Sequence, residues 1–208
     1  MKQTLSILMT ISLLVTGCTS IRYGDPTATE TVTAEYGSTD LQTLAQGMVA
    51  ELNLVAGLDY INKQGNGGDP RIVLYFDNIY NETREHINMG LLRDKMIAEL
   101  VSTGRYRVVA GQLGQDEVGQ QVRFQQGSGH VDPQQAKADG RQVGADVVIY
   151  GAMRDITKKT GRSLDSGGTR TKDVYYNLFL RMDNIETAET LWAKDKEIRK
   201  RQVTGLFG

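Results

Sequence analysis

Two histidines and one serine are the residues of this sequence whose types and spacing come closest to a catalytic site. His86 and His130 stand 44 positions apart in polar segments, and neither has a cysteine or a second histidine at the spacing that zinc ligands need. Ser128 lies two positions before His130. However, no G-x-S-x-G motif surrounds it, and no third group stands where it would orient a base. The sequence predicts no catalytic residue, no metal site and no cofactor; a hydrolase using Ser128 and His130 remains an alternative.

The single cysteine is placed for a different chemistry. Lys2 precedes an apolar run over residues 5–15 that is broken only by hydroxyl side chains, and small residues follow it. This is the pattern of a secretory signal peptide, and the run is shorter than the ~20 residues that span a membrane. The tetrapeptide Val15-Thr16-Gly17-Cys18 resembles the lipobox of bacterial lipoproteins. We therefore expect residues 1–17 to be a signal peptide that is removed, and Cys18 to carry lipid.

The resemblance to lipoproteins also implies an address. Several acyl chains on one residue, at about 0.8 kcal/mol per buried CH₂, make a lasting membrane anchor. Thr19 follows the cysteine, where an aspartate favours retention in the inner membrane of Gram-negative bacteria. The expected location is the outer membrane, with the protein lipid-anchored and facing the periplasm. An ordinary signal peptide with an incidental cysteine is the alternative.

Composition limits the remaining possibilities. The formal net charge is −1, which provides no electrostatic footprint for nucleic acid, so none is expected as a partner. One cysteine excludes an internal disulfide. Residues 18–39 are rich in Thr, Ser, Gly and Glu, which predicts a flexible tether that reaches at most ~70 Å when fully extended. Residues 40–208 are long enough for one globular domain.

Hydrophobic periodicity predicts the elements of this domain. Asp40 is the expected N-cap of a helix that continues to Val55. The other expected helices cover 91–101, 112–126 and 134–143, and the expected strands cover 71–76, 105–109, 146–156, 174–182 and 190–197. Polar loops are expected over 77–88 and 158–172, with a turn at 185–189.

This order of elements indicates the fold class. Two early strands separated by a helix require a crossover connection, whereas the last three strands follow one another through reversals. The sheet should therefore be mixed, with helices packed on it. We expect an α+β fold in which a mixed β-sheet is flanked by helices.

Four segments together resemble the LpoB family of outer-membrane lipoproteins. They are the lipobox, the strand and loop from Ile72 to Thr83, the segment from Val143 to Gly151, and the segment from Asn184 to Trp192. The resemblance implies a domain like the N-terminal domain of TolB. It also implies a function without catalytic residues, in which the lipoprotein docks on the regulatory domain of a class A penicillin-binding protein and activates that bifunctional synthase in peptidoglycan synthesis.

One feature differs from the best-known members of that family. Their tether is long and rich in proline, whereas the expected tether here has only Pro26. A short tether suits a partner close to the outer membrane. The alternative function is therefore an accessory of outer-membrane secretion or surface-structure assembly, bound to another envelope protein complex.

Two segments are candidates for the partner-binding surface. The polar loop from Asn78 to Arg84 is longer than a tight turn requires, which is typical of functional loops. The basic segment from Lys194 to Arg201 could contact an acidic partner or form a solvated edge strand. The residues selected for partner binding are Asn78, Tyr80, Asn81, Arg84, Lys196 and Arg199.

Overall fold

The structure is a computed structural model, and it describes residues 24–30, 33–63, 66–137, 143–161 and 168–205. The expected signal peptide, residues 1–17, and Cys18 lie outside the described residues. The elements in chain order are α2 (Ser38–Asn53), the 3₁₀ helix η2 (Ala56–Tyr60), β1 (Ile72–Glu82), α3 (Met89–Ser102), β2 (Tyr106–Val109), α4 (Gln112–Gly127), β3 (Val147–Thr160), β4 (Arg170–Asn184) and β5 (Thr190–Thr204).

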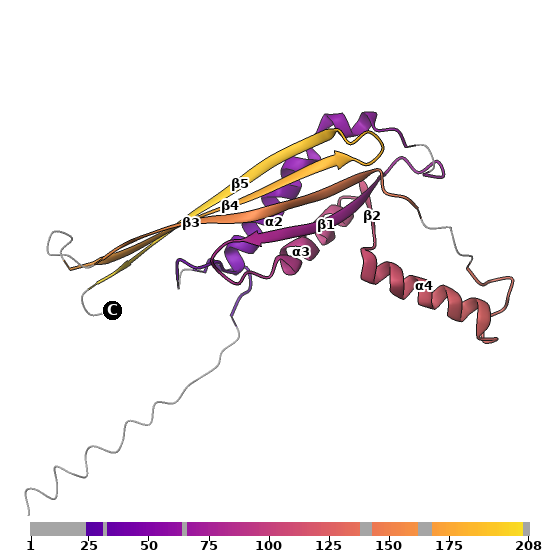
Figure 1. The fold of residues 1–208 in the computed structure, drawn as a ribbon, viewed down its shortest axis with the longest axis horizontal. Helices are drawn as coiled ribbons and strands as arrows, with labels where there is room; N and C mark the ends of the chain where they lie inside the picture. Colours follow the sequence, from indigo (N-terminus) through magenta and orange to yellow (C-terminus); the bar gives the residue numbers. More distant parts are fainter. Residues whose placement is uncertain (1–23, 31–32, 64–65, 138–142, 162–167, 206–208) are drawn as a thin grey trace, which may run out of the picture.

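The strands form one mixed sheet in the order β2-β1-β3-β4-β5 (Figure 1). β1 pairs in parallel with β2 and β3, while β3, β4 and β5 are antiparallel neighbours. α3 makes the crossover between the parallel strands β1 and β2, as parallel pairing requires. The α+β class with a mixed sheet is therefore confirmed.

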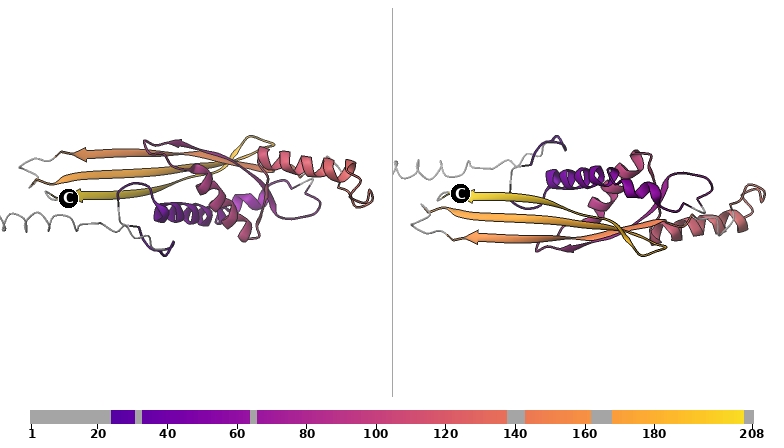
Figure 2. Two further views of the ribbon diagram at one scale, coloured as in Figure 1. Left: turned by 90° about the horizontal axis from the view of Figure 1, so that it is seen from below. Right: turned by 90° about the horizontal axis from the view of Figure 1, so that it is seen from above.

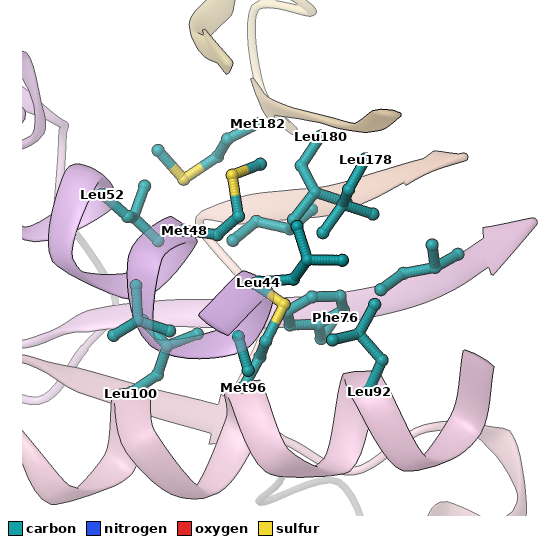
Figure 3. Close-up of a cluster of buried hydrophobic side chains, with 14 of the residues drawn as sticks. Leu44, Met48, Leu52, Phe76, Leu92, Met96, Leu100, Leu178, Leu180 and Met182 are labelled. Atoms are coloured by element: carbon teal, nitrogen blue, oxygen red, sulfur yellow. The ribbon is translucent and has the colours of Figure 1, made fainter. Parts of the chain in front are cut away.

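Helices α2 and α3 pack on one face of this sheet (Figure 2). The core between them is lined by apolar side chains from both layers (Figure 3). Leu44 and Met48 from α2, Leu92 from α3, and Leu178 and Leu180 from β4 are all fully buried. Full burial stabilises the fold by roughly 1.5–3 kcal/mol for each such side chain, so this layer holds the domain together.

Helix α2 begins three residues earlier than its hydrophobic pattern predicts. Its N-cap is Gly37, and Asp40 is the third helical residue rather than the cap. The Asp40 carboxylate accepts a hydrogen bond from the Gly37 backbone N–H at 2.9 Å. Since glycine has no side chain, this is the only half of a capping box that can form. The carboxylate caps the helix, but from inside its first turn.

Strands β1, β3, β4 and β5 are longer than predicted, because polar and charged residues at their ends made these segments resemble loops. A bulge between Phe76 and Ile79 lets β1 continue to Glu82, so the first half of the expected 77–88 loop is strand. Likewise the β3–β4 ladder continues to the pair Thr160 and Thr171, and the expected 158–172 loop is mostly strand in its described part. Segments 156–160, 170–175 and 199–204 pair with one another at one end of the β3–β4–β5 ladders, and together we call them the arm. The far end of these strands reaches past the helices (Figure 2).

The helix expected over 134–143 is wrong in its described part. Residues 133–135 form a turn, and residues 138–142 lie outside the described ranges. The Asp132 carboxylate accepts a hydrogen bond from the Gln134 backbone N–H at 3.0 Å. This local bond offers the backbone an alternative to a continuing helix.

Helix α4 confirms the expected helix over 112–126 and extends away from the sheet (Figure 1). None of its side chains is buried, so it contributes no residue to the core. Within the described ranges, no helix is long and apolar enough to cross a membrane.

Part of the range assigned to the tether is packed against the domain. Residues 33–37, which we call the strap, lie just before α2. Ala34 is only 2% exposed, and the ring of Tyr36 meets that of Tyr176 edge-on, with centroids 5.9 Å apart. The packed chain therefore includes residues on the N-terminal side of position 40.

Candidate protein-interaction surface

The sheet face opposite α2 and α3 is not covered by either helix, and we call it the bare face (Figure 2). Side chains alternate between the two faces of a strand, so β4 shows which residues belong to each. Val174, Tyr176 and Leu178 are buried under the helices and the strap, whereas Tyr175 and Asn177 between them are half-buried and lie on the bare face.

Strand register aligns the bare-face side chains in rows that cross several strands. Tyr80 of β1 lies beside Ala152 of β3, which pairs with Phe179 of β4. Further along, Ile156 of β3 pairs with Tyr175, which pairs with Arg199 of β5. Because paired residues point to the same face, aromatic and aliphatic side chains from separate strands come together here.

A shallow groove of about 700 Å³ lies on this face where the arm begins. The exposed aliphatic residue beside it is Ile156, whose exposed fraction is 59%. Tyr80 has the same exposed fraction of 59%. Exposed apolar side chains in a groove rimmed by polar residues are typical of protein-binding sites. The lining residues are Ile156, Lys158, Asp173, Tyr175, Glu197 and Arg199.

The charges around the groove are paired with one another. Asp173 accepts hydrogen bonds from Arg199 at 2.7 Å and from Arg201 at 3.0 Å. These bonds, that from Arg199 foremost, hold the pKa of Asp173 well below its usual range. The Tyr175 hydroxyl donates to Glu197, and this bond raises the pKa of the phenol. The groove is therefore polar at its rim without a large excess of either sign.

The basic segment from Lys194 to Arg201 does not form one patch. Alternation places Arg199 and Arg201 on the bare face, but Lys194 and Lys200 on the opposite face. There Lys194 pairs with Glu51 at 3.8 Å, and Lys200 pairs with Asp40 at 2.9 Å. The structure thus divides the predicted basic surface between the two faces.

Of the residues selected from the sequence, Tyr80 and Arg199 share the bare face. Lys196 lies on the other face, with its side chain beside Gly47 of α2. Asn78 is exposed at the β1 bulge and lines a separate groove between β1 and α3. The residues were selected because they are neighbours in the sequence, but the alternation of side chains along the strands places them on different surfaces.

Asn81 and Arg84 serve the turn after β1. The Asn81 side-chain amide donates to the backbone oxygen of Glu85 at 2.9 Å. The backbone N–H of Arg84 donates to the Asp155 carboxylate at 2.8 Å, while the Arg84 residue is exposed. These bonds hold the turn against β3, and the bond from Arg84 uses its backbone rather than its guanidinium group.

The serine and histidines have structural contacts that differ from a catalytic arrangement. The Ser128 hydroxyl accepts a hydrogen bond from the backbone N–H of His130 at 3.2 Å. The His130 ring stacks on Phe124, with centroids 6.0 Å apart. His86 is exposed near the N-terminus of α3. In the described part of the chain, no group of three or more histidine, cysteine or acidic side chains is arranged to hold a metal ion.

Sequence reasoning missed the central residues of the groove, Ile156, Asp173 and Tyr175. The signal that could have found Ile156 is its position within an alternating run, where the apolar side chain falls on the face that carries Arg154 and Lys158. Asp173 was missed because it falls between the expected loop over 158–172 and the expected strand over 174–182.

Together the elements form an α+β domain with a groove on the bare face of its sheet. A family model described as the peptidoglycan-synthase activator LpoB matches residues 40–198. The chain therefore belongs to the LpoB family of peptidoglycan-synthase activators. No curated protein sequence matches the chain.

Several solved structures are similar to this one. The LpoB C-terminal domain from Salmonella enterica is 17% identical, with a TM-score of 0.44, and the match covers 77% of this chain and 99% of that domain. The LpoB C-terminal domain from Escherichia coli is 18% identical, with a TM-score of 0.42 and the same coverage of 77% and 99%. Lipoprotein GNA1162 from Neisseria meningitidis is 17% identical, with a TM-score of 0.35, over 64% of this chain and 84% of that one.

Proposed function

We propose that this protein is an outer-membrane lipoprotein that binds a bifunctional penicillin-binding protein through the bare face and activates it in peptidoglycan synthesis. Membership of a family of peptidoglycan-synthase activators supports the activity. The contact is made with the regulatory domain of the synthase, and the lipoprotein supplies no catalytic group.

The exposed apolar side chains of the bare face, Ile156 in the groove and Tyr80 outside it, are the observation that carries the choice of surface. Ile156 and Tyr80 are both more than half exposed, although they lie on a sheet face. Arg199 and Arg201 are both paired with Asp173, so a partner that covers this cluster does not bury an unpaired ion. Binding energy then comes from covering the apolar and aromatic side chains, which are the usual anchors of interfaces.

Replacing Ile156 with a charged residue tests this surface. We expect Ile156→Asp to weaken binding of purified class A penicillin-binding proteins at least tenfold, or about 1.4 kcal/mol, because a carboxylate replaces an apolar anchor. Affinity is measured by biolayer interferometry with the full mature chain. Stimulation of glycan polymerisation should fall in parallel.

Leu113→Asp is the matched control, because Leu113 is 84% exposed on α4, away from the bare face. It makes the same change of charge and should bind as the wild type does. Equal affinity of Ile156→Asp and the wild type would exclude the bare face as the docking surface. Failure of the wild type to bind any class A penicillin-binding protein at tens of micromolar would exclude the proposed partner.

The lipid anchor is a separate part of the proposal. We expect Cys18→Ser to release the protein from membranes into the soluble periplasmic fraction, because no thiol remains for lipid attachment. We expect Thr19→Asp to move the protein to the inner membrane. Density-gradient fractionation followed by immunoblotting distinguishes these locations. A Cys18→Ser protein that stays with the outer membrane would contradict anchoring through this residue.

A second candidate is an accessory of outer-membrane secretion or surface-structure assembly. The packed strap favours it, because chain packed on the domain adds no length to the tether and thus favours a partner near the outer membrane. Co-purification with an envelope assembly, together with normal cell-wall synthesis rates in a deletion strain, would support this candidate over the first.

A further inference from the structure

The strap joins the expected anchor segment to the domain, and it is held on the helix-bearing face near the arm. Ala34 is buried, and its backbone oxygen accepts a hydrogen bond from the Tyr176 hydroxyl at 3.4 Å. The Tyr36 ring packs edge-on against Tyr176. Tyr176 is fully buried, and the strap residues Ala34 and Tyr36 are among those that cover it.

Polar bonds hold the same segment. The backbone N–H of Tyr36 donates to the Glu85 carboxylate at 2.9 Å, and the Tyr176 hydroxyl donates to the same carboxylate at 2.8 Å. The Lys200 ammonium donates to the backbone oxygen of Glu35 at 2.6 Å. The strap is thus bound by side chains from the turn after β1, from β4 and from β5.

The chain before the strap is also attached to α2. The Gln42 amide donates to the backbone oxygen of Pro26 at 2.6 Å. The Glu30 carboxylate accepts from the backbone N–H of Ser38 at 2.8 Å, and the Glu30 backbone N–H donates to Thr39 at 2.7 Å. Both described segments that precede α2 are therefore bonded to the domain.

These contacts change how far the domain can stand from an anchor at Cys18. If the attached chain begins at Gly24, only about six residues remain, and fully extended they reach roughly 20 Å. If the chain is free as far as Gly37, about 20 residues reach roughly 70 Å. The difference of roughly 50 Å depends on whether the strap and the preceding turn are docked.

We propose that the strap is a releasable clamp that sets the working distance between the domain and the outer membrane; this rests on the proposed lipid anchor. In the docked state the domain is held close to the membrane. Release of the strap, with segment 24–30 detaching from α2 along with it, lets the bare face reach a synthase that stands deeper in the periplasm.

The composition of the strap contacts allows local release. Ala34 is the single fully buried apolar residue that the strap contributes. The Tyr36 hydroxyl is buried without a hydrogen-bond partner among the described residues, which is a cost of docking that release removes. Segments with few buried apolar contacts open at lower free energy than the global core.

A charge at the buried strap position tests the clamp. Ala34→Glu should release the strap without altering the body of the domain, and Thr33→Glu places the same charge at an exposed neighbour. Hydrogen exchange of the mature lipidated chain on vesicles reports docking at the Tyr36 amide, with the buried Leu44 as the core reference. We expect at least tenfold faster exchange at Tyr36 in Ala34→Glu, and no change in Thr33→Glu or at Leu44.

The distance from the membrane is measured on the same proteins. The sequence has one cysteine, so once Cys18 is lipidated a Leu54→Cys substitution provides a unique labelling site. Energy transfer from this label to acceptor lipids should fall in Ala34→Glu and stay unchanged in Thr33→Glu.

Three results would overturn the clamp. The first is a Tyr36 amide that exchanges in the wild type as fast as an unprotected amide. The second is a Tyr36 amide that exchanges as slowly as the Leu44 amide both in the wild type and in Ala34→Glu, and the third is unchanged energy transfer in Ala34→Glu although its Tyr36 amide exchanges faster. A wild-type chain that leaves the vesicles would overturn the anchor and with it the effect on distance, whereas the exchange data would still report the docking. Binding of a synthase is not used in either readout, so failure of the proposed partner is distinguished from failure of the clamp.

Discussion

Asp173 is the residue on which the charges of the groove converge. Its carboxylate forms ion pairs with Arg199 and Arg201 of the neighbouring strand β5, and both arginines are mostly exposed. Exposed ion pairs contribute little to stability, so the role of this cluster is to fix two guanidinium groups beside Tyr175. A largely buried carboxylate that positions two exposed arginines gives the groove a defined polar edge.

Acid should weaken this cluster only at low pH. The folded-state pKa of Asp173 is lowered, so its contribution to stability is present above the unfolded-state pKa of about 3.9 and is lost as the pH falls through the lower folded-state value. We expect the stability difference between the wild type and Asp173→Asn to be constant from about pH 5 to pH 7 and to shrink below about pH 4. Urea unfolding at a series of pH values measures this difference. A difference that already declines near pH 6 would show that another group is responsible.

At the scale of elements, the close approach of β3 and β4 at Gly151 limits what the sheet accepts. A Cβ at this position would lie 2.0 Å from the backbone oxygen of Phe179 and 2.8 Å from the Leu180 side chain. Gly151 pairs with Ile79, immediately after the bulge in β1. The bulge and the glycine therefore occur at the same level of the sheet.

Gly151→Ala should destabilise the domain by roughly 1–3 kcal/mol, because backbone must move to accept the methyl group. Gly57→Ala is the control, since nothing lies within 4 Å of a Cβ at that position. Thermal unfolding followed by circular dichroism compares the two variants. A Gly151→Ala protein as stable as Gly57→Ala would show that β4 shifts without cost.

At the scale of the molecule, the arm and α4 project from opposite ends of the sheet (Figure 1). The arm continues the β3–β4–β5 ladders and shares their backbone hydrogen bonds. In contrast, α4 buries none of its side chains. The two extensions thus differ in how they are held.

We expect α4 to open independently of the domain, because it lacks the buried contacts that couple an element to global unfolding. Its amides, represented by Val118 and Phe124, should exchange hydrogen at least a hundredfold faster than that of Leu178 in the core. Native-state hydrogen exchange followed by mass spectrometry measures both. Equal protection of α4 and β4 would contradict this expectation.

Much of the fold could be predicted because its signals are local. The spacing of Leu44, Met48 and Leu52 identifies α2, and the apolar run that includes Ile149 identifies β3. The ends of the strands could not be predicted in the same way. Beyond Ile156 the β3 side chains are charged or polar on both faces, since neither face is covered by a helix there, so the composition resembled a loop.

The sequence by itself determined the α+β class, the kinds and order of most elements, and the expectation that Cys18 carries lipid, because helix and strand periodicity and the signal pattern are properties of neighbouring residues. Tertiary structure alone decided that Tyr80 and Arg199 share a face while Lys196 does not, and that the strap packs on Tyr176. These are long-range relations, set by strand register and by which faces the helices cover, and no local pattern encodes them.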